Sequence, residues 1–248
     1  MKALILAAGF GTRLMPLTAH TPKALVKVSG KTLLEIAIRK LVFHGFSEIV
    51  VNAHHHADQV IDYLKMNQFG NVTISISDET DYLLDTGGAI LKAGWFLKSE
   101  EPFLVHNVDV ISNLNLGNLY SYHLEKKALA TVSITDRQTK RYFLFDDELL
   151  LRGWTDTGSG EVRMAAGVSG PLKKLAFSGI HVISPGIFDL FEEQGRFSII
   201  DTYLRLAGGH PIFGYIQPGL TWFDVGKPAQ LADAERFLRD HPDNFLPV

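Results

Sequence analysis

The order of apolar and polar positions in the first half of the chain predicts strands and helices in alternation. Short apolar or alternating runs, which are typical of strands, occupy residues 3–8, 49–51, 72–77 and 103–105. Helices are expected between these runs, at residues 34–42, 57–67 and 86–98. Four strands separated by three helices favour an α/β fold, doubly wound around a mostly parallel mixed sheet in the manner of a Rossmann fold.

Local signals support this order near the N-terminus. Thr32 and Glu35 have the spacing of a capping box, in which the threonine hydroxyl accepts a backbone N–H and the glutamate reaches back. Gly45 provides the left-handed stop that is typical of a helix end. Residues 1–53 therefore predict a βαβ unit, whose crossover connection implies parallel strands.

The second half of the chain is less regular. Further helices are expected at residues 116–125, 185–193, 198–207 and 228–238, and strands at residues 128–135, 175–183, 212–213 and 221–223. Ser178 and Gly179 lie inside one of these strands, which indicates a β-bulge or a close approach of the backbone. Residues 136–174 are interpreted as a β-hairpin insertion that covers the sheet edge. No repeat or long linker divides the chain, so we expect a single domain over residues 1–248.

The composition limits the classes of function. With 46% hydrophobic and 21% charged residues, the 248-residue chain has the balance of a soluble globular protein with a substantial core. Its net charge of −3 gives no basic surplus for nucleic acid, and no apolar run approaches the ~20 residues of a membrane span. The chain has no cysteine, which excludes disulfides and thiolate chemistry. We expect a cytoplasmic protein with no signal peptide and with neither a nucleic-acid nor a membrane partner.

The turn after the first strand is a candidate phosphate site. Two glycines, Gly9 and Gly11, allow the chain to curl so that several backbone N–H groups meet an anion closely. Arg13 adds a planar fork of donors and Lys23 adds a compact charge a short loop away. The third glycine of a dinucleotide-binding motif is replaced by Leu14, and a P-loop motif is absent. An ordinary strand-to-helix turn with solvated basic residues is the alternative.

Two aspartates that follow predicted strands are candidate metal ligands. Asp109 comes after the strand at 103–105, and Asp224 directly follows the strand at 221–223. If both strands share the central sheet, their carboxyl ends meet at one rim. Carboxylates are the ligands through which proteins hold Mg²⁺ on a triphosphate. The alternatives are an Asx-turn for Asp109 and a helix cap for Asp224.

The run His54-His55-His56 also suggests a metal. Three consecutive residues cannot place their side chains on one face of a strand or a helix, so they do not form a zinc site by themselves. The run is interpreted as a loop that leads into the next helix.

Five segments together resemble the sugar-1-phosphate nucleotidyltransferase family. They are G-F-G-T-R with the later P-K at 22–23, L-D-T-G-G at 84–88, V-H-N-V-D at 105–109, F-S-G-I at 177–180 and W-F-D-V-G at 222–226. They occur in the order of that family and cover nearly the whole chain. Two residues depart from the pattern, since Val108 replaces a glycine and Ala24 replaces a proline.

The resemblance implies a role for each matching residue. The nucleotide would be bound by Ala8, Gly9, Gly11, Thr12, Arg13, Lys23, Asp85, Thr86, Gly87 and Gly88. The sugar would be bound by Asn107, Ser178 and Gly179, and Mg²⁺ by Asp109 and Asp224. Arg13, Lys23 and Asp109 would be catalytic. The attacking sugar phosphate is already an anion, so the reaction needs positioning and charge neutralisation rather than a general base.

Within the family, the motifs most resemble the enzymes that transfer a uridylyl group from UTP to N-acetylmuramate-1-phosphate in cell-wall (peptidoglycan) recycling. A guanylyltransferase for mannose- or heptose-1-phosphate is the nearest alternative, and choline phosphate is a more distant acceptor. An alternative of another class is a non-catalytic sensor of nucleotide sugars. The partners expected are therefore a nucleoside triphosphate and a sugar-1-phosphate, bound by a monomer or a small homo-oligomer.

Overall fold

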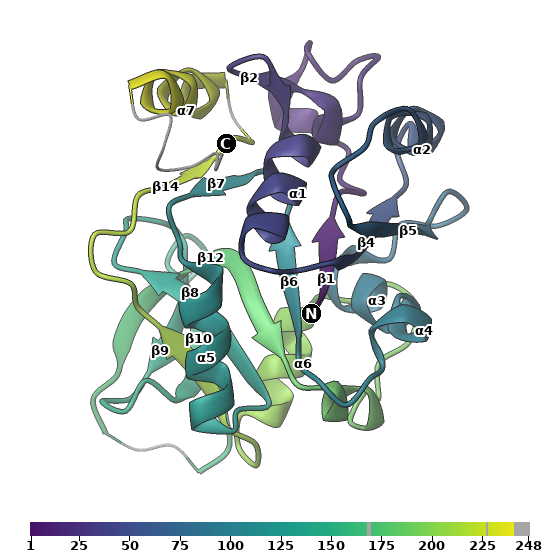
Figure 1. The fold of residues 1–248 in the computed structure, drawn as a ribbon. Coiled ribbons are helices and arrows are strands. Elements are labelled where there is room, and N and C mark those ends of the chain that lie inside the picture. Colours follow the sequence, from purple (N-terminus) through teal and green to yellow (C-terminus); the bar gives the residue numbers. More distant parts are fainter. Residues whose placement is uncertain (168–169, 227, 241–248) are drawn as a thin grey trace.

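The computed structural model describes residues 1–167, 170–226 and 228–240, which are built around a mixed sheet of ten strands (Figure 1). Four strands in the order β5, β4, β1 and β6 form its parallel half: β1 (Lys2–Leu6), β4 (Glu48–Ala53), β5 (Thr73–Asp78) and β6 (Phe103–Asn107). Strand β1 pairs in parallel with both β4 and β6. The predicted βαβ unit and the α/β fold class are confirmed.

The antiparallel half of the sheet comes from the second half of the chain. Its strands are β8 (Ala130–Thr135), β9 (Arg141–Phe145), β10 (Leu151–Asp156), β11 (Glu161–Met164) and β12 (Lys173–Ile183), and β13 (Ile212–Tyr215) pairs in parallel with β8. Strand β12 runs antiparallel to β6 and joins the two halves. Its register against β8 shifts between Phe177 and His181, and Gly179 has a φ of 76°, so the predicted irregularity is confirmed.

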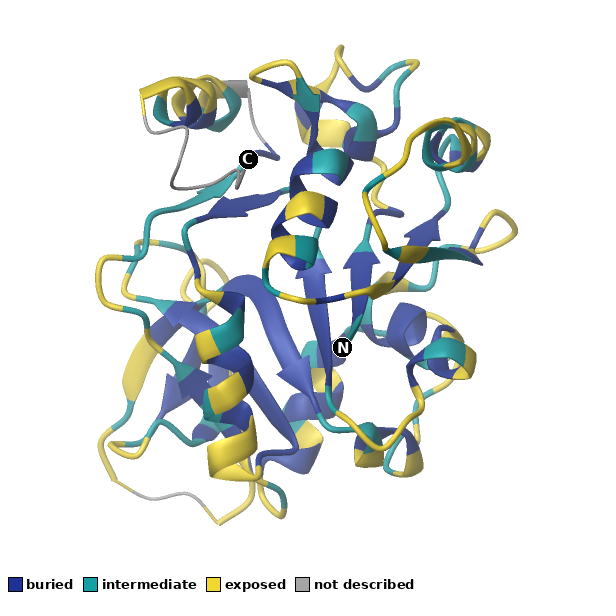
Figure 2. Ribbon diagram, viewed as in Figure 1, coloured by how far each residue is buried: buried dark blue, intermediate teal, exposed yellow. Residues whose placement is uncertain are grey.

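Helices cover both faces of the sheet (Figure 1). The first face carries α1 (Leu33–Phe43), α2 (Ala57–Met66) and α5 (Leu116–Lys126), and the second carries α3 (Asp85–Lys92), α4 (Gly94–Leu97) and α6 (Ile199–Leu206), whereas α7 (Pro228–Asp240) packs against β14 and β2 beyond the sheet. Neighbouring residues of β1 serve opposite faces, because Ala3 and Ile5 belong to one apolar cluster and Leu4 to the other. Figure 2 shows these strands buried beneath helices whose outer sides are exposed. Burial on both faces explains the continuous apolar runs in the sequence.

Helix α1 begins at the predicted cap. The Thr32 side chain accepts the Glu35 backbone N–H at 3.0 Å. The Glu35 carboxylate does not reach back as a capping box requires, because it pairs with the Arg39 guanidinium at 2.7 Å. Only the threonine half of the predicted box is present.

Two predicted helices differ from the structure. The helix expected at 86–98 is divided at Ala93 into α3 and α4, and Gly94 lies against the ring of Phe188. The helix expected at 185–193 is only the 3₁₀ helix η3 (Pro185–Asp189). The Arg205 guanidinium donates to the Leu190 carbonyl at 2.9 Å. In a longer helix this carbonyl would instead accept a backbone N–H.

Several short elements lie within the loops at the top of the sheet. They are the 3₁₀ helices η1 (Thr12–Leu14) and η2 (Lys23–Leu25), the hairpin β2 (Lys27–Val28) and β3 (Lys31–Thr32), and the ribbon of β7 (Val110–Ser112) with β14 (Trp222–Asp224). Among the described residues, no helix has both the length and the apolar character needed to cross a membrane.

Candidate active site

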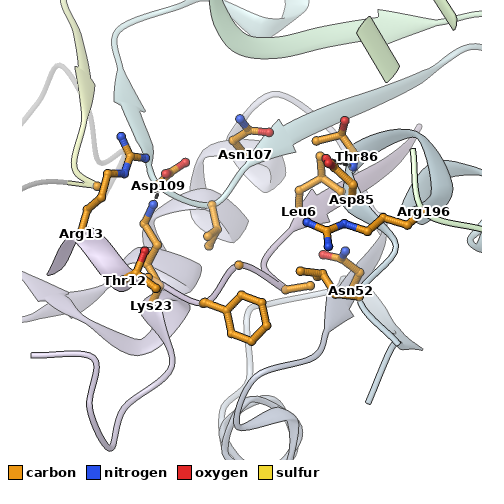
Figure 3. Close-up of a pocket in the computed structure, with 17 residues that line it drawn as sticks. Leu6, Thr12, Arg13, Lys23, Asn52, Asp85, Thr86, Asn107, Asp109 and Arg196 are labelled. Carbon is orange, nitrogen blue, oxygen red and sulfur yellow. Dashed lines mark hydrogen bonds and ion pairs between the residues drawn. The ribbon is translucent and has the colours of Figure 1, made fainter. Parts of the chain in front are cut away.

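A cavity of about 390 Å³ lies beyond the carboxyl ends of β1, β4 and β6 (Figure 3). Ligands of doubly wound sheets bind at this edge. Many predicted site residues line the cavity: Ala8, Gly9, Gly11, Thr12, Arg13, Lys23, Asp85, Thr86, Asn107 and Asp109. Segments separated by about a hundred residues in the sequence therefore meet around one space.

The turn after β1 has the geometry of an anion site. Gly11 adopts the left-handed conformation, with φ of 66° and ψ of 22°, and the 3₁₀ helix η1 follows directly. A Cβ at this position would lie 2.9 Å from the Thr18 methyl carbon and 3.1 Å from the Lys23 Cβ, so only glycine fits. The Thr18 hydroxyl donates to the Gly11 carbonyl at 2.8 Å. In the described structure no hydrogen bond uses the N–H of Gly9 or Gly11, which leaves these donors for a ligand.

Lys23 links the basic turn to the acidic residues. Its side chain is buried, with 9% exposed, and its Nζ forms an ion pair with Asp109 Oδ2. Arg13 Nη1 lies 3.8 Å from Asp224 Oδ2. A Cβ on Gly226 would lie 3.1 Å from Lys23 Nζ and 2.8 Å from Asp224 Oδ1. Two cations and two carboxylates therefore gather around Gly226.

A strand pairing that the sequence analysis did not predict places Asp224 in this cluster. Strand β14 does not join the central sheet but pairs antiparallel with β7, opposite the expectation of a shared sheet. The register places Asp224 opposite Val110, next to Asp109, and the Val225 N–H donates to the Asp109 carbonyl at 2.9 Å. The two acids meet because β7 follows β6 after a tight turn and then binds β14.

The acidic pair fits a hard divalent cation. Both ligands are carboxylates, and their side chains are partly exposed, at 17% for Asp109 and 28% for Asp224. No third histidine, aspartate or glutamate completes a metal cage within the described ranges. Mg²⁺ is commonly held by one or two carboxylates, with phosphate oxygens and water as its other ligands. The two carboxylates therefore suit a cation such as Mg²⁺ whose other ligands include phosphate oxygens.

The predicted base-binding segment has two parts with different surroundings. Asp85 and Thr86 line the cavity, and Asp85 has a φ of 59°, held by the Thr86 N–H on its carboxylate at 2.6 Å. Gly87 and Gly88 do not line the cavity. A Cβ on Gly87 would overlap the Phe197 ring, and one on Gly88 would overlap the Gly195 carbonyl. The two glycines thus leave room for a neighbouring loop.

The three residues predicted to bind the sugar differ in how close they lie to the cavity. Asn107 lines the cavity, whereas Ser178 and Gly179 lie behind it, since a Cβ on Gly179 would be 2.8 Å from Asn107 Nδ2. The Trp222 indole donates to the Ser178 carbonyl at 2.8 Å, and the Arg137 guanidinium stacks 4.2 Å from the Trp222 ring centre. Ser178 and Gly179 therefore support the wall that Asn107 presents.

Sequence reasoning missed two polar residues of the cavity, Asn52 and Arg196. Asn52, at the end of β4, accepts the Ala7 N–H at 2.6 Å and donates to Glu79 Oε1 at 2.8 Å. Burial raises the pKa of the Glu79 carboxyl. The signal for Asn52 was its place at a strand end that faces the same rim. The sequence gives no local signal for Arg196.

The run His54-His55-His56 lies beside the turn that follows β1. His54 Nδ1 is 2.6 Å from the Glu79 carbonyl oxygen, and the Phe10 ring lies 5.3 Å from the His54 ring centre, edge to face. The ring centres of His55 and His56 lie 4.0 Å apart, with the two rings tilted by 49°. These contacts fix the loop between β4 and α2 against the turn.

Comparisons with known proteins identify relatives of this chain. The model of the nucleotidyl transferase family matches residues 2–145. The chain is 34% identical to an N-acetylmuramate alpha-1-phosphate uridylyltransferase of Caulobacter vibrioides, over 96% of this chain and 97% of that protein. It is 29% identical to mannose-1-phosphate guanylyltransferase 1 of Arabidopsis thaliana over 97% of this chain, which spans 65% of that protein. The solved structure of a UDP-glucose pyrophosphorylase from Acinetobacter baumanii shares the fold, with a TM-score of 0.79 at 18% identity over 97% of this chain and 94% of that one.

Proposed function

The chain belongs to the nucleotidyl transferase family and is a sugar-1-phosphate nucleotidyltransferase, and from this premise we propose that it transfers the uridylyl group of UTP to N-acetylmuramate-1-phosphate. The similarity to the Caulobacter uridylyltransferase supports this choice, because it covers both proteins almost completely. The products would be the UDP-sugar and pyrophosphate. The proposal includes a role in peptidoglycan recycling and a location in the cytoplasm.

The observation that carries the chemistry is the gathering of Arg13, Lys23, Asp109 and Asp224 at one end of the cavity. A phosphate oxygen of the acceptor attacks the α-phosphorus of UTP, a new O–P bond forms, and the bond to the bridging oxygen of the departing pyrophosphate breaks. The N–H groups near Gly11 and the Arg13 fork hold the departing phosphates. Lys23 holds an oxygen of the phosphate under attack, where negative charge builds up.

Asp109 and Asp224 would hold Mg²⁺, which when bound offsets phosphate charge and orients the triphosphate. Lys23 is the counter-ion of Asp109 in this structure. We infer that Lys23 moves from this carboxylate to the phosphate when the nucleotide enters. Asn107 would hold the sugar from the wall that Gly179 supports.

One assay tests the proposal. The purified protein is supplied with Mg²⁺, each of UTP, GTP, CTP and ATP, and each of N-acetylmuramate-1-phosphate, N-acetylglucosamine-1-phosphate and mannose-1-phosphate. Pyrophosphate release and the mass of the product are measured. We expect the highest kcat/KM with UTP and N-acetylmuramate-1-phosphate. A higher kcat/KM with GTP and mannose-1-phosphate would replace the proposal by the guanylyltransferase alternative, which the Arabidopsis relative supports.

A further inference from the structure

Arg196 occupies the end of the cavity that lies away from the acidic and basic cluster. It lines the cavity together with Asp85, Thr86 and Asn52. Figure 3 shows its side chain pointing into the space near Asp85, opposite the end that holds Arg13 and Lys23. Among the described residues it forms no ion pair. A guanidinium without a carboxylate partner inside a ligand cavity is available to bind a ligand.

Four hydrogen bonds fix the loop that carries Arg196. The N–H groups of Gly87 and Gly88 donate to the Phe197 carbonyl at 3.0 and 3.3 Å, and the Phe197 N–H donates to the Leu84 carbonyl at 3.2 Å. The Ile199 N–H donates to the Thr86 hydroxyl at 3.0 Å. Because Gly87 and Gly88 leave room for Phe197 and Gly195, the loop can lie this close to α3. The segment that presents Asp85 and the loop that presents Arg196 are thus one unit.

This unit offers a donor beside an acceptor. A guanidinium can only donate hydrogen bonds and an ionised carboxylate can only accept them. One Asp85 oxygen accepts the Thr86 N–H, and the other accepts no hydrogen bond from the described residues, which leaves it available to a ligand. A base with a carbonyl next to a ring N–H matches this pair, as uracil does with O4 and N3–H and guanine with O6 and N1–H. Cytosine and adenine present an amino group and a bare ring nitrogen, so they place donor against donor and acceptor against acceptor.

We propose that Arg196, with Asp85, selects the base of the nucleotide by its carbonyl and adjacent ring N–H. This inference rests on the proposed function, because it places the triphosphate at the Arg13 and Lys23 end. It extends that function by naming the residue that admits UTP or GTP and rejects CTP and ATP. Arg196 lies beside Asp85 at the end of the cavity opposite Arg13 and Lys23, the two cations that we assign to the phosphates, so we assign recognition of the base to Arg196 (Figure 3).

The test compares nucleotides within one variant. For the wild type, Arg196→Met and Arg196→Lys, kcat/KM is measured for UTP, CTP, GTP and ATP with the best acceptor. We expect Arg196→Met to lower the preference for UTP over CTP, and for GTP over ATP, by about tenfold or more, through a loss on UTP and GTP. Arg196→Lys keeps the charge but not the planar fork, so it should recover only part of the preference. Arg236→Met, which removes an exposed arginine from α7, is the matched control and should leave all four values unchanged.

Two results would overturn the inference. An equal fall in kcat/KM for all four nucleotides in Arg196→Met would mean that Arg196 only attracts the triphosphate charge. An unchanged preference would mean that other groups read the base. Calorimetric binding of UTP and CTP without any acceptor gives the same comparison, so the inference is decided even if no sugar phosphate is turned over. Failure of the proposed function would instead appear as absent transfer by the wild type.

Discussion

Lys23 is the residue at which the opposing charges of the cavity meet. It is buried and pairs with Asp109, while Gly226 leaves the space between it, Arg13 and Asp224 open. A buried lysine that keeps its charge is costly unless an anion or hydrogen-bond acceptors compensate it. In this structure the Asp109 carboxylate compensates Lys23, and under the proposed function a phosphate replaces the carboxylate and releases Asp109 for a cation.

The first prediction concerns Asp109. Replacing it with asparagine keeps the shape but removes the charge that pairs with Lys23 and would hold Mg²⁺. We expect kcat to fall on the order of a hundredfold or more, because a charge contact at the reacting phosphate is lost. Turnover is measured over a range of Mg²⁺ concentrations. Asp62→Asn, an exposed position on α2, is the control, and near-normal turnover with unchanged Mg²⁺ dependence in Asp109→Asn would contradict the assignment.

The second prediction concerns Gly226. A Cβ there would lie 2.8 Å from Asp224 Oδ1 and 2.9 Å from Arg13 Nη2, so Gly226→Ala must displace charged groups. We expect a loss of activity of about tenfold or more, since small displacements at a reacting centre carry a large cost. Activity and melting temperature are compared with those of Gly209→Ala, where a Cβ meets nothing within 4 Å. Full activity in Gly226→Ala would show that the cluster tolerates the methyl group.

Four charged residues at one end of the cavity could be predicted from the sequence because each lies in a short motif that the sequence itself shows. Arg13, Lys23 and Asp109 line the cavity as expected, and Asp224 lies beside them. Arg196 could not be predicted, because its position depends on hydrogen bonds between Phe197 and residues 84–88, more than a hundred positions away. Gly87 and Gly88 were expected at the base, but steric space for Phe197 and Gly195 explains them in this structure.

At the scale of elements, the ribbon of β7 and β14 decides where the two acids lie. Lys40, on α1, donates from beneath to the Ser112 carbonyl and, at 3.2 Å, to the Ser112 hydroxyl. Burial lowers the pKa of the Lys40 ammonium to about 7. Helix α1 is therefore tied to the ribbon through a lysine that loses its proton more readily in the folded state than in the unfolded state.

The third prediction follows from this pKa. Between pH 7 and 10.5 the unfolded chain keeps the Lys40 proton that the folded chain releases, so the free energy of unfolding rises with pH in this window. The increase is at most about 1.4 kcal/mol per pH unit from one group. Chemical denaturation at pH 6.5 and 8.5 compares the wild type with Lys40→Met. We expect the wild type to gain stability relative to the variant at the higher pH, and an identical pH dependence of the two proteins would refute it.

The elements that were predicted well are those whose local pattern and tertiary environment agree. Helix α1 has both a threonine cap and an apolar face against β1, and it lies close to its expected residues. The stretch 185–193 has apolar residues and a proline at its start, but Arg205 binds both Leu190 and Glu193 and holds the chain away from a helix. The pairing of β14 with β7 instead of the main sheet could not be predicted either. A strand of three residues is too short for its apolar and polar pattern to indicate which strand it pairs with.

At the scale of the molecule, the cavity is built from the two faces of the sheet together. The end that we assign to the phosphates belongs to the N-terminal turn and to the β7 and β14 ribbon, whose apolar residues pack in the cluster under α1. The end that we assign to the base belongs to α3 and the loop before α6, whose residues pack in the cluster on the other face. A nucleotide that fills the cavity therefore contacts parts that the sheet otherwise keeps apart.

The last prediction is that UTP protects both ends at once from amide hydrogen exchange. With Mg²⁺ and UTP, we expect slower exchange in residues 9–14 and in residues 195–199, because ligand binding lowers the population of locally opened states by mass action. Pyrophosphate should slow exchange in residues 9–14 alone, and uridine in residues 195–199 alone. Exchange in α5, which lies outside the cavity, is the internal reference. Since the two segments belong to different apolar clusters, joint protection by UTP requires one ligand that spans the sheet edge, whereas protection of one segment by UTP would place the nucleotide on a single face.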